Sequence, residues 1–210
     1  MPSARTQIAN QGLAFIGVSQ QIVDLDLPSE RSNEAIQCRL FFDSAVEFAL
    51  RDADWNSARR YVALALEASA VLTGLSWTYK YVYPADCAAL RAILPPGLRQ
   101  PRADQRVDYE VANENIGGGD KLVIYTDQPQ AVARYTKFLT NPNLFDSQLA
   151  LAISYLLGSM VAMPLAVKPA IAEQARNGYA AMISRAGAAN LRERQDGVEP
   201  ESQLIAYRNG

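Results

Sequence analysis

The sequence predicts an α+β fold, with a bundle of about four helices built from both ends of the chain and a β-rich lobe built from its middle. Two patterns in the 210 residues predict it. Apolar residues recur at helical spacing near both ends, and strand-forming residues alternate around glycine-rich turns in the middle. We therefore expect the bundle in residues 1–58 and 140–191, the lobe in residues 59–139, and an extended C-terminal tail in residues 192–210.

Two helices are expected before the middle of the chain, in residues 4–17 and 33–52. Gly17 is a natural end for the first helix, and Ser32 or Asn33 can cap the second. The apolar residues that share one face of the first helix are Ile8, Leu13 and Ile16. Those that share one face of the second are Cys38, Phe41, Phe42, Ala45 and Phe48 or Ala49.

The middle of the chain contains several segments with a strand pattern. The run "ARRYVALAL" alternates as a strand does, although its alanines fit a helix equally well, and we favour a strand. "WTYKYVY" is rich in strand-forming residues. The segments "RVDYEV" and "KLVIY" flank the turn "NENIGGGD" and predict a β-hairpin. The segment "AVARYTKFLT" predicts one more strand or a helical turn.

Two further helices are expected after the lobe. Asn141 can cap the first of them, with Pro142 at its first helical position, and Pro164 marks its end. The apolar residues along its face are Leu149, Ile153, Leu156, Leu157, Met160 and Val161. Pro169 begins the second helix, whose shared face contains Ile171, Ala175, Tyr179, Met182 and Ala186.

Composition removes several classes of function. The net charge of −2 leaves no basic surplus for holding nucleic acid, and the absence of histidine removes the commonest general base and transition-metal ligand. The two cysteines, Cys38 and Cys87, are too few for a zinc site and are expected to be reduced, buried, small apolar residues. We find no signal peptide, and residues 149–167 are too interrupted to span a membrane, so we expect a soluble protein that stays inside the cell that makes it.

Three stretches invite a catalytic or binding interpretation. The run from Gly117 to Lys121 lacks the spacing of a phosphate-binding loop and is better read as a hairpin turn. Asp52 and Asp54 beside Trp55 could form a glycosidase-like carboxylate pair, but the ending of a helix and a turn of the chain explain them better.

The third stretch is Tyr83, Pro84, Asp86 and Cys87, which follows the tyrosine-rich segment without a gap. Cys87 has no histidine to activate it and no basic neighbour in sequence. Asp86 after a proline can accept hydrogen bonds from backbone amides one to three residues on. We interpret these four residues as a structural corner rather than an active site.

The order of motifs is more specific than any one of them. "ANQGLAFIGVSQQIVDLD" is followed by "CRLFFDSAVEFALRDADWNSA", then "YKYVYPADCAALRAI", then a hairpin ending in "VIYTD", and then "ARYTKFLTNPNLFDSQLALAISYLLGSMVAMPL". From about residue 8 to residue 189, this order resembles the tail tubular protein A family, the head-to-tail adaptors of short-tailed bacteriophages. The chain departs from the family pattern after Trp55 and Asn56, where Ser57 stands in place of a common phenylalanine.

The resemblance implies a structural protein of the virion, made in the host cytoplasm. It implies a homo-oligomeric ring of twelve subunits between the portal protein and a tail tubular protein B-like nozzle, with double-stranded DNA passing through the lumen without specific binding. It implies no cofactor and no catalysis. The slightly acidic composition agrees, because a lumen without basic clusters lets DNA slide without sticking.

Two other classes of function stay open. A tail-associated cell-wall hydrolase would need placed carboxylates, for which Asp54 and Asp86 are the candidates. A small monomeric binding module would need no ring at all, and its mass in solution would distinguish it.

The C-terminal tail is polar from Arg192 onward but ends in an apolar cluster. We expect it to dock on the portal or on a neighbouring subunit, and to become ordered only there. The docking residues would be Leu204, Ile205, Tyr207 and Arg208. A stray strand or a crystal contact is the alternative interpretation of this cluster.

Overall fold

The structure is a computed structural model that describes residues 3–68, 76–98, 106–116 and 118–192. Within these ranges it contains four α-helices, which are α1 (Ala4–Phe15), α2 (Asn33–Asp52), α3 (Ser147–Val161) and α4 (Pro169–Arg192). Among the same residues, no helix is both long and apolar enough to cross a membrane.

The strands form two antiparallel sheets. The smaller sheet has the order β1 (Arg59–Ala63), β7 (Val132–Lys137), β4 (Cys87–Leu94). The larger has the order β2 (Leu66–Ala68), β3 (Tyr79–Val82), β6 (Gly119–Thr126), β5 (Tyr109–Ile116). Helices and antiparallel sheets in separate parts of one chain confirm the predicted α+β class.

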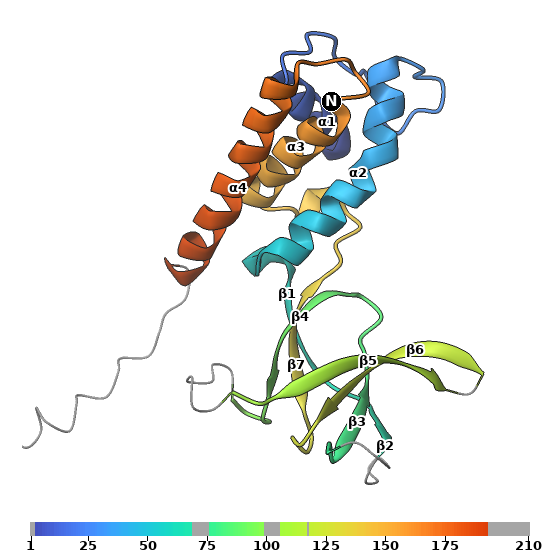
Figure 1. The fold of residues 1–210 in the computed structure, drawn as a ribbon, viewed down its shortest axis with the longest axis vertical. Helices are drawn as coiled ribbons and strands as arrows, with labels where there is room; N and C mark the ends of the chain where they lie inside the picture. The colour runs from blue at the N-terminus through green and yellow to red at the C-terminus, as the bar shows by residue number, and fades with distance from the viewer. Residues whose placement is uncertain (1–2, 69–75, 99–105, 117, 193–210) are drawn as a thin grey trace, which may run out of the picture.

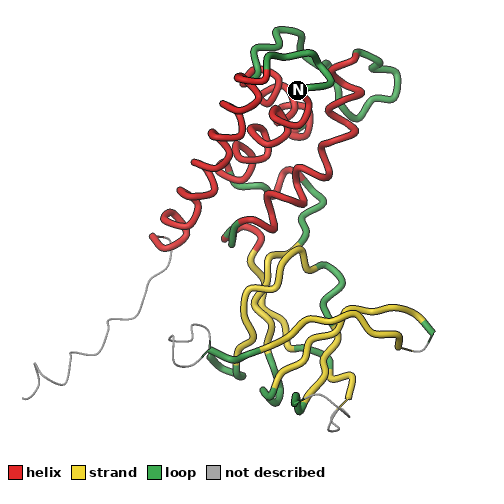
Figure 2. The backbone as a smooth tube through the Cα atoms, in the orientation of Figure 1, coloured by secondary structure: helices red, strands yellow, loops and turns green. Residues whose placement is uncertain are grey.

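Helices and strands occupy opposite ends of an elongated molecule (Figure 1). The helices gather in the upper part of the view and the strands in the lower part (Figure 2). The chain passes from the helices to the strands between α2 and β1, and it returns between β7 and α3. The lower end of α2 lies against β4 and β7, so this helix forms most of the contact between the two ends.

The four helices share one cluster of buried apolar residues, in which α3 contacts each of the other three. Helices α1 and α3 approach each other closely at two glycines. A Cβ atom on Gly12 would lie 2.8 Å from the carbonyl oxygen of Ser154, and one on Gly158 would lie 2.6 Å from that of Gly12. Only glycine fits at these two crossing positions without a shift of the helices.

The helix ends were predicted with one error. Ser32 caps α2, because its Oγ accepts a hydrogen bond from the Ala35 amide at 3.4 Å, and Gly17 has a positive φ of 75° just after α1. Asn141 was wrong as the cap of α3. It precedes a single 3₁₀ turn, η3 (Pro142–Leu144), and α3 is capped by Asp146, whose Oδ1 accepts from the Leu149 amide at 2.8 Å.

A second apolar cluster lies between the two sheets. Its fully buried members are Tyr81, Ile93, Ile124, Ala131, Ala133 and Tyr135. The hairpin prediction is confirmed as β5 and β6, whose pairing continues to Ile116 opposite Gly119, well into the segment predicted as the turn. The ambiguous segment after residue 58 is strand, as favoured, and "AVARYTKFLT" contributes strand β7.

Strand β4 was not predicted. Its sequence "CAALRAIL" contains three alanines, which are poor strand formers. Pairing with β7 makes it a strand, and register shifts between Cys87 and Ala89 and between Leu90 and Ala92 leave one extra β4 residue at each place. These extra residues are Ala88 and Arg91, and a β-bulge of this kind redirects the side chain that it carries.

Candidate functional site

The corner predicted at Tyr83 to Cys87 contains a tight turn. The carbonyl oxygen of Pro84 accepts a hydrogen bond from the Cys87 amide at 3.1 Å. The carbonyl oxygen of Asp86 accepts another from the Phe138 amide at 2.7 Å. The turn therefore joins the end of β3 to the start of β4 and also holds the residue that follows β7.

The Asp86 carboxylate binds side chains from the neighbouring strands. Its Oδ1 accepts from the Tyr135 hydroxyl at 2.7 Å, and its Oδ2 accepts from Arg60 Nη1 at 2.8 Å, with Lys137 Nζ at 3.7 Å. The prediction that backbone amides farther along the chain bind this carboxylate was wrong, because β1 and β7 bring three donor side chains to it. Burial alone would raise the pKa of Asp86, but the Tyr135 hydrogen bond and the two cations hold that pKa below its ordinary value.

The two cysteines differ in their surroundings. Cys38 is fully buried in the helical cluster, as predicted, and burial raises the pKa of its thiol to about 12. Cys87 is only half-buried, and its Sγ lies 3.1 Å from the Tyr83 hydroxyl. Burial also raises the pKa of Cys87. Both thiols therefore stay protonated at neutral pH, which is unlike the thiolate of a nucleophilic cysteine.

Arg91 connects the strands to the end of α2. The bulge in β4 directs its side chain toward the helix, where Nη2 donates to the carbonyl oxygens of Leu50, Arg51 and Ala53 at 2.9, 2.9 and 2.6 Å. Its Nε donates to Thr136 Oγ1 on β7 at 2.9 Å. A cation placed on the last carbonyl groups of a helix satisfies them and opposes the negative end of the helix dipole.

Asp52, Asp54 and Trp55 also lie at this junction. Asp52 Oδ2 accepts from the Tyr179 hydroxyl of α4 at 2.7 Å, and Asp54 pairs with Arg59 at 3.1 Å. The Trp55 side chain is 1% exposed, and its Nε1 donates to the Ala49 carbonyl at 2.7 Å. All three side chains have partners within the subunit.

The two carboxylates considered for a hydrolase, Asp54 and Asp86, are each bound by arginine side chains. The pKa of Asp86 is held below its ordinary value, whereas a general acid needs a carboxyl that keeps its proton near neutral pH. Within the described ranges, no three histidine, cysteine, aspartate or glutamate side chains are grouped so as to hold a metal ion.

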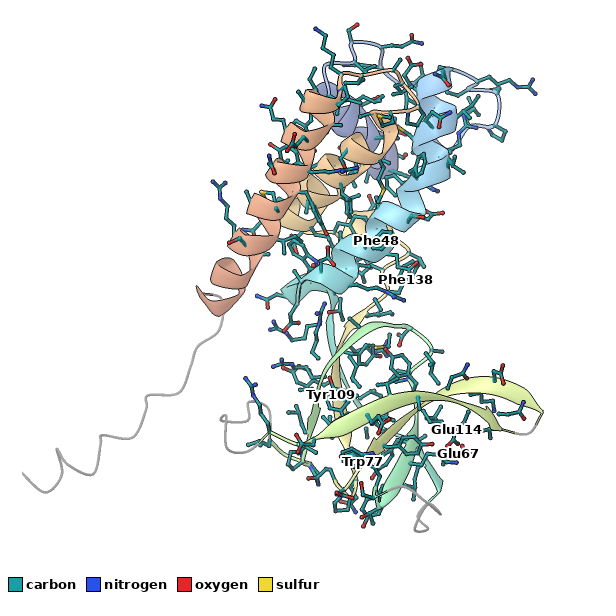
Figure 3. All side chains as sticks on the ribbon, viewed as in Figure 1. Phe48, Glu67, Trp77, Tyr109, Glu114 and Phe138 are labelled. Atoms are coloured by element: carbon teal, nitrogen blue, oxygen red, sulfur yellow. The ribbon has the colours of Figure 1, made fainter. Side chains whose placement is uncertain are left out.

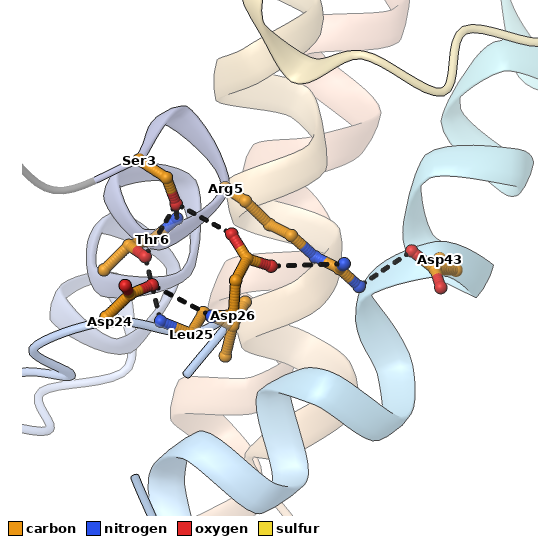
Figure 4. A network of polar contacts seen from close by, with 7 residues as sticks. All are labelled: Ser3, Arg5, Thr6, Asp24, Leu25, Asp26 and Asp43. Carbon is orange, nitrogen blue, oxygen red and sulfur yellow. Dashed lines mark hydrogen bonds and ion pairs between the residues drawn. The ribbon is translucent and has the colours of Figure 1, made fainter. Parts of the chain in front are cut away.

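A polar network joins the start of α1 to the following loop and to α2 (Figure 4). The Arg5 guanidinium lies 4.6 Å above the Phe42 ring, and its Nη atoms reach Asp26 at 3.4 Å and Asp43 at 2.9 Å. A cavity of about 540 Å³ lies beside it, lined also by apolar residues of the connection from β7 to α3. Sequence analysis did not predict that these three charged residues lie together, because the loop that carries Asp26 has no periodic pattern of apolar residues.

A second cavity, also of about 540 Å³, lies among the strands and is lined by three arginines, Arg91, Arg106 and Arg134. Sequence analysis missed all three. The signal for Arg91 was present, because a charged residue in the middle of the apolar run "CAALRAIL" requires a buried partner.

Exposed apolar side chains mark another surface. Ile36 and Leu40, four residues apart on α2, are 47% and 66% exposed. Their spacing places them side by side on the face of α2 opposite the buried Cys38 and Phe42. Phe48, on the same helix, is 53% exposed near its lower end (Figure 3), so Ala49 is the buried member of that predicted pair.

The predicted docking residues of the tail, Leu204, Ile205, Tyr207 and Arg208, lie outside the described residues. No protein family model matches the chain, and no curated protein matches it significantly.

Proposed function

We propose that this protein is a structural adaptor of a short-tailed phage virion, which forms a ring between the portal and the tail nozzle and continues the DNA channel. The observation that carries this proposal is the order of motifs from about residue 8 to residue 189, which resembles the tail tubular protein A family. In this proposal, residues 1–58 and 140–191 act as one helical bundle and residues 59–139 as a β-rich lobe.

The shape of the subunit supports this role. Helices at one end and strands at the other give an elongated molecule with two chemically different ends (Figure 1). An adaptor between two different protein rings needs two different ends. Contacts between neighbours in a ring are heterologous, so a surface on one side of each subunit meets a different surface on the next.

The exposed apolar pair on α2 supports the ring contact. Ile36 and Leu40 are too exposed to contribute much to the subunit's own core. Adjacent exposed apolar residues on a helix are typical of a surface that a partner covers. We place the contact with the neighbouring subunit at this pair and the docking of residues 192–210 on the portal or on a neighbouring subunit.

Assembly with the portal tests the proposal. The purified chain is mixed with the portal protein of the same virion, and the complex is examined by electron microscopy and by mass measurement. We expect a ring whose added mass is about 276 kDa, twelve times the 23.0 kDa subunit. The same assay with residues 196–210 deleted is expected to show weaker attachment. A subunit that stays monomeric with the portal, or that forms only two-fold dimers on it, would contradict the proposal.

Peptidoglycan hydrolysis is the matched test of the alternative. If the purified chain releases soluble fragments from cell walls, and Asp54→Asn or Asp86→Asn abolishes the release while the variant stays folded, the hydrolase interpretation replaces the adaptor.

A further inference from the structure

The arginine-lined cavity among the strands has an unusual charge for this chain. Arg91 comes from β4, Arg134 from β7, and Arg106 from the segment before β5, and among the described lining residues Asp108 is the acidic one. Among the described lining residues three arginines therefore face one aspartate, whereas the whole chain carries a net charge of −2. Tyr109, which lies among the strands (Figure 3), and Val107 add an aromatic and an apolar wall.

The positive charge of Arg134 is poorly compensated within the subunit. Its Nε is buried without a hydrogen-bond acceptor, and its nearest carboxylate oxygen, Asp54 Oδ2, lies 3.8 Å from Nη2. That carboxylate is already bound more closely by Arg59, at 3.1 Å. A partly buried cation with so little compensation is costly, unless a counter-charge occupies the space beside it.

Arg91 and Arg106 differ in how firmly their side chains are held. Arg91 is held in place by the α2 carbonyl groups and by Thr136, so its charge is fixed at the cavity wall. Burial lowers the pKa of Arg91; the charge of Asp54 raises it, and the charge of Arg134 lowers it to a smaller extent. Arg106 is exposed and has no hydrogen bond or ion pair with any other residue in the described part of the chain.

We infer that this cavity is a binding site for a phosphate-class oxyanion, in which Arg134 and Arg106 bind the ligand and Arg91 supplies a fixed positive charge. The surplus of arginines among the described lining residues suits an anion. Guanidinium groups bind such oxygens through paired N–H donors. The volume of about 540 Å³ exceeds the size of a phosphate ion and leaves room for an organic substituent beside Tyr109.

Thermal unfolding with inorganic phosphate as the probe tests the inference. Unfolding of the full chain is followed at increasing phosphate concentration, with chloride replaced so that ionic strength stays constant, and isothermal titration measures binding directly. A ligand that binds only the folded state raises the midpoint of unfolding. Once its concentration exceeds the dissociation constant, the rise grows with the logarithm of that concentration. We expect phosphate to raise the midpoint and acetate to leave it unchanged.

Charge reversal at Arg106 provides the matched variant. Arg106 is exposed and has no hydrogen bond or ion pair with another described residue, so we expect Arg106→Glu to keep the midpoint measured without phosphate. It should weaken phosphate binding by at least about tenfold. Arg134→Lys keeps the charge but loses the planar pair of donors, and it should weaken binding less. Arg176→Glu, on the exposed side of α4, is the control and should bind phosphate as the wild type does.

Three results would overturn the inference. They are a midpoint that rises no more with phosphate than with chloride or acetate, an Arg106→Glu variant that still responds fully, and an Arg176→Glu variant that loses the response as well. The test uses the isolated subunit, so its outcome is independent of whether the protein forms a ring on a portal.

Discussion

At the scale of single residues, Asp86 is the most connected side chain of the corner. Its carboxylate accepts from Tyr135 and Arg60 and lies 3.7 Å from Lys137. Asp86→Asn should destabilise the protein at neutral pH by about 1 kcal/mol, the value of a charge-assisted bond reduced for partial exposure to solvent. Urea unfolding measures the difference, with Asp108→Asn, an exposed aspartate without an ion pair among the described residues, as the control.

The difference in stability between the wild type and Asp86→Asn should also depend on pH. The pKa of Asp86 is lower in the folded protein than its ordinary value, so the carboxylate stabilises the fold above the unfolded-state pKa. That stabilisation is lost as pH falls through the folded-state pKa. The wild type and Asp86→Asn should therefore converge in stability as pH falls below the folded-state pKa of Asp86. A difference that stays constant from neutral to acid pH would show that the carboxylate charge is not the cause.

The cysteines give a prediction about reactivity. Because burial raises the pKa of Cys38 to about 12 and also raises that of Cys87, alkylation by iodoacetamide at pH 8 should be slow for both in the native protein. Cys38, fully buried in the helical cluster, should react only when the protein unfolds. Mass spectrometry of peptides after timed alkylation measures each rate. Rapid labelling of Cys87 in the native state would indicate an activated thiol and contradict the structural role of the corner.

Sequence reasoning placed Asp86 and Cys87 together at a turn, but it could not find their partners. Tyr135 and Arg60 lie 49 and 26 residues away from Asp86 in sequence. Contacts of this kind depend on strand order, and no local period encodes that order.

At the scale of elements, the C-terminal end of α2 depends on a residue of β4. Arg91→Ala would leave the carbonyl groups of Leu50, Arg51 and Ala53 without this donor. We expect a loss of about 2 kcal/mol in the free energy of unfolding and faster amide exchange in the last turn of α2. Arg91→Lys keeps the charge but has fewer donors, so its free energy of unfolding should lie between those of the wild type and Arg91→Ala. An unchanged urea midpoint for Arg91→Ala would show that these hydrogen bonds contribute nothing net.

The crossing of α1 and α3 gives a second prediction at this scale. Gly12→Ala and Gly158→Ala would each place a Cβ atom less than 3 Å from a backbone oxygen of the facing helix. Each should destabilise the protein by about 1–3 kcal/mol, as overpacked cores do. Gly187→Ala on α4 meets nothing within 4 Å and is the control. It gains helix propensity without a clash and should stabilise the protein by up to about 1 kcal/mol.

Measurement of the three variants by thermal unfolding separates the two effects. If Gly12→Ala and Gly187→Ala change stability in the same direction, the close approach of α1 and α3 does not occur in solution.

The elements with a strong period were the predictable ones. The face of α2 and the hairpin of β5 and β6 follow from apolar spacing and from glycines at the turn. Strand β4 was missed, because its alanines and its two bulges remove the alternation that marks a strand. The start of α3 was placed too early, since Asn141 and Pro142 begin a 3₁₀ turn that has the same end signals as an α-helix.

At the scale of the whole molecule, the separation of helices from strands follows from the distribution of patterns along the chain, but the arginine-lined cavity does not. Arg91, Arg106 and Arg134 reach it from segments whose mutual position depends on two sheets packing together. The exposed pair on α2, Ile36 and Leu40, differs from the cavity because part of it can be read from the sequence. Its spacing is visible in the sequence, yet only the packing of the other helices shows which face of α2 is left uncovered.

That uncovered face gives the last prediction. In the double variant Ile36→Ser/Leu40→Ser, the free subunit should unfold within about 0.5 kcal/mol of the wild type, because these side chains are 47% and 66% exposed. If the proposed ring contact lies at this pair, ring assembly on the portal should be lost, because that contact would lose its apolar centre. Met163→Ser is the control, since Met163 is 68% exposed and lies beyond the end of α3, away from the α2 pair in sequence, and it should assemble normally. Sedimentation and electron microscopy measure both properties. A double variant that assembles as the wild type does would place the ring contact elsewhere, and one that unfolds would assign both side chains to the subunit's own core.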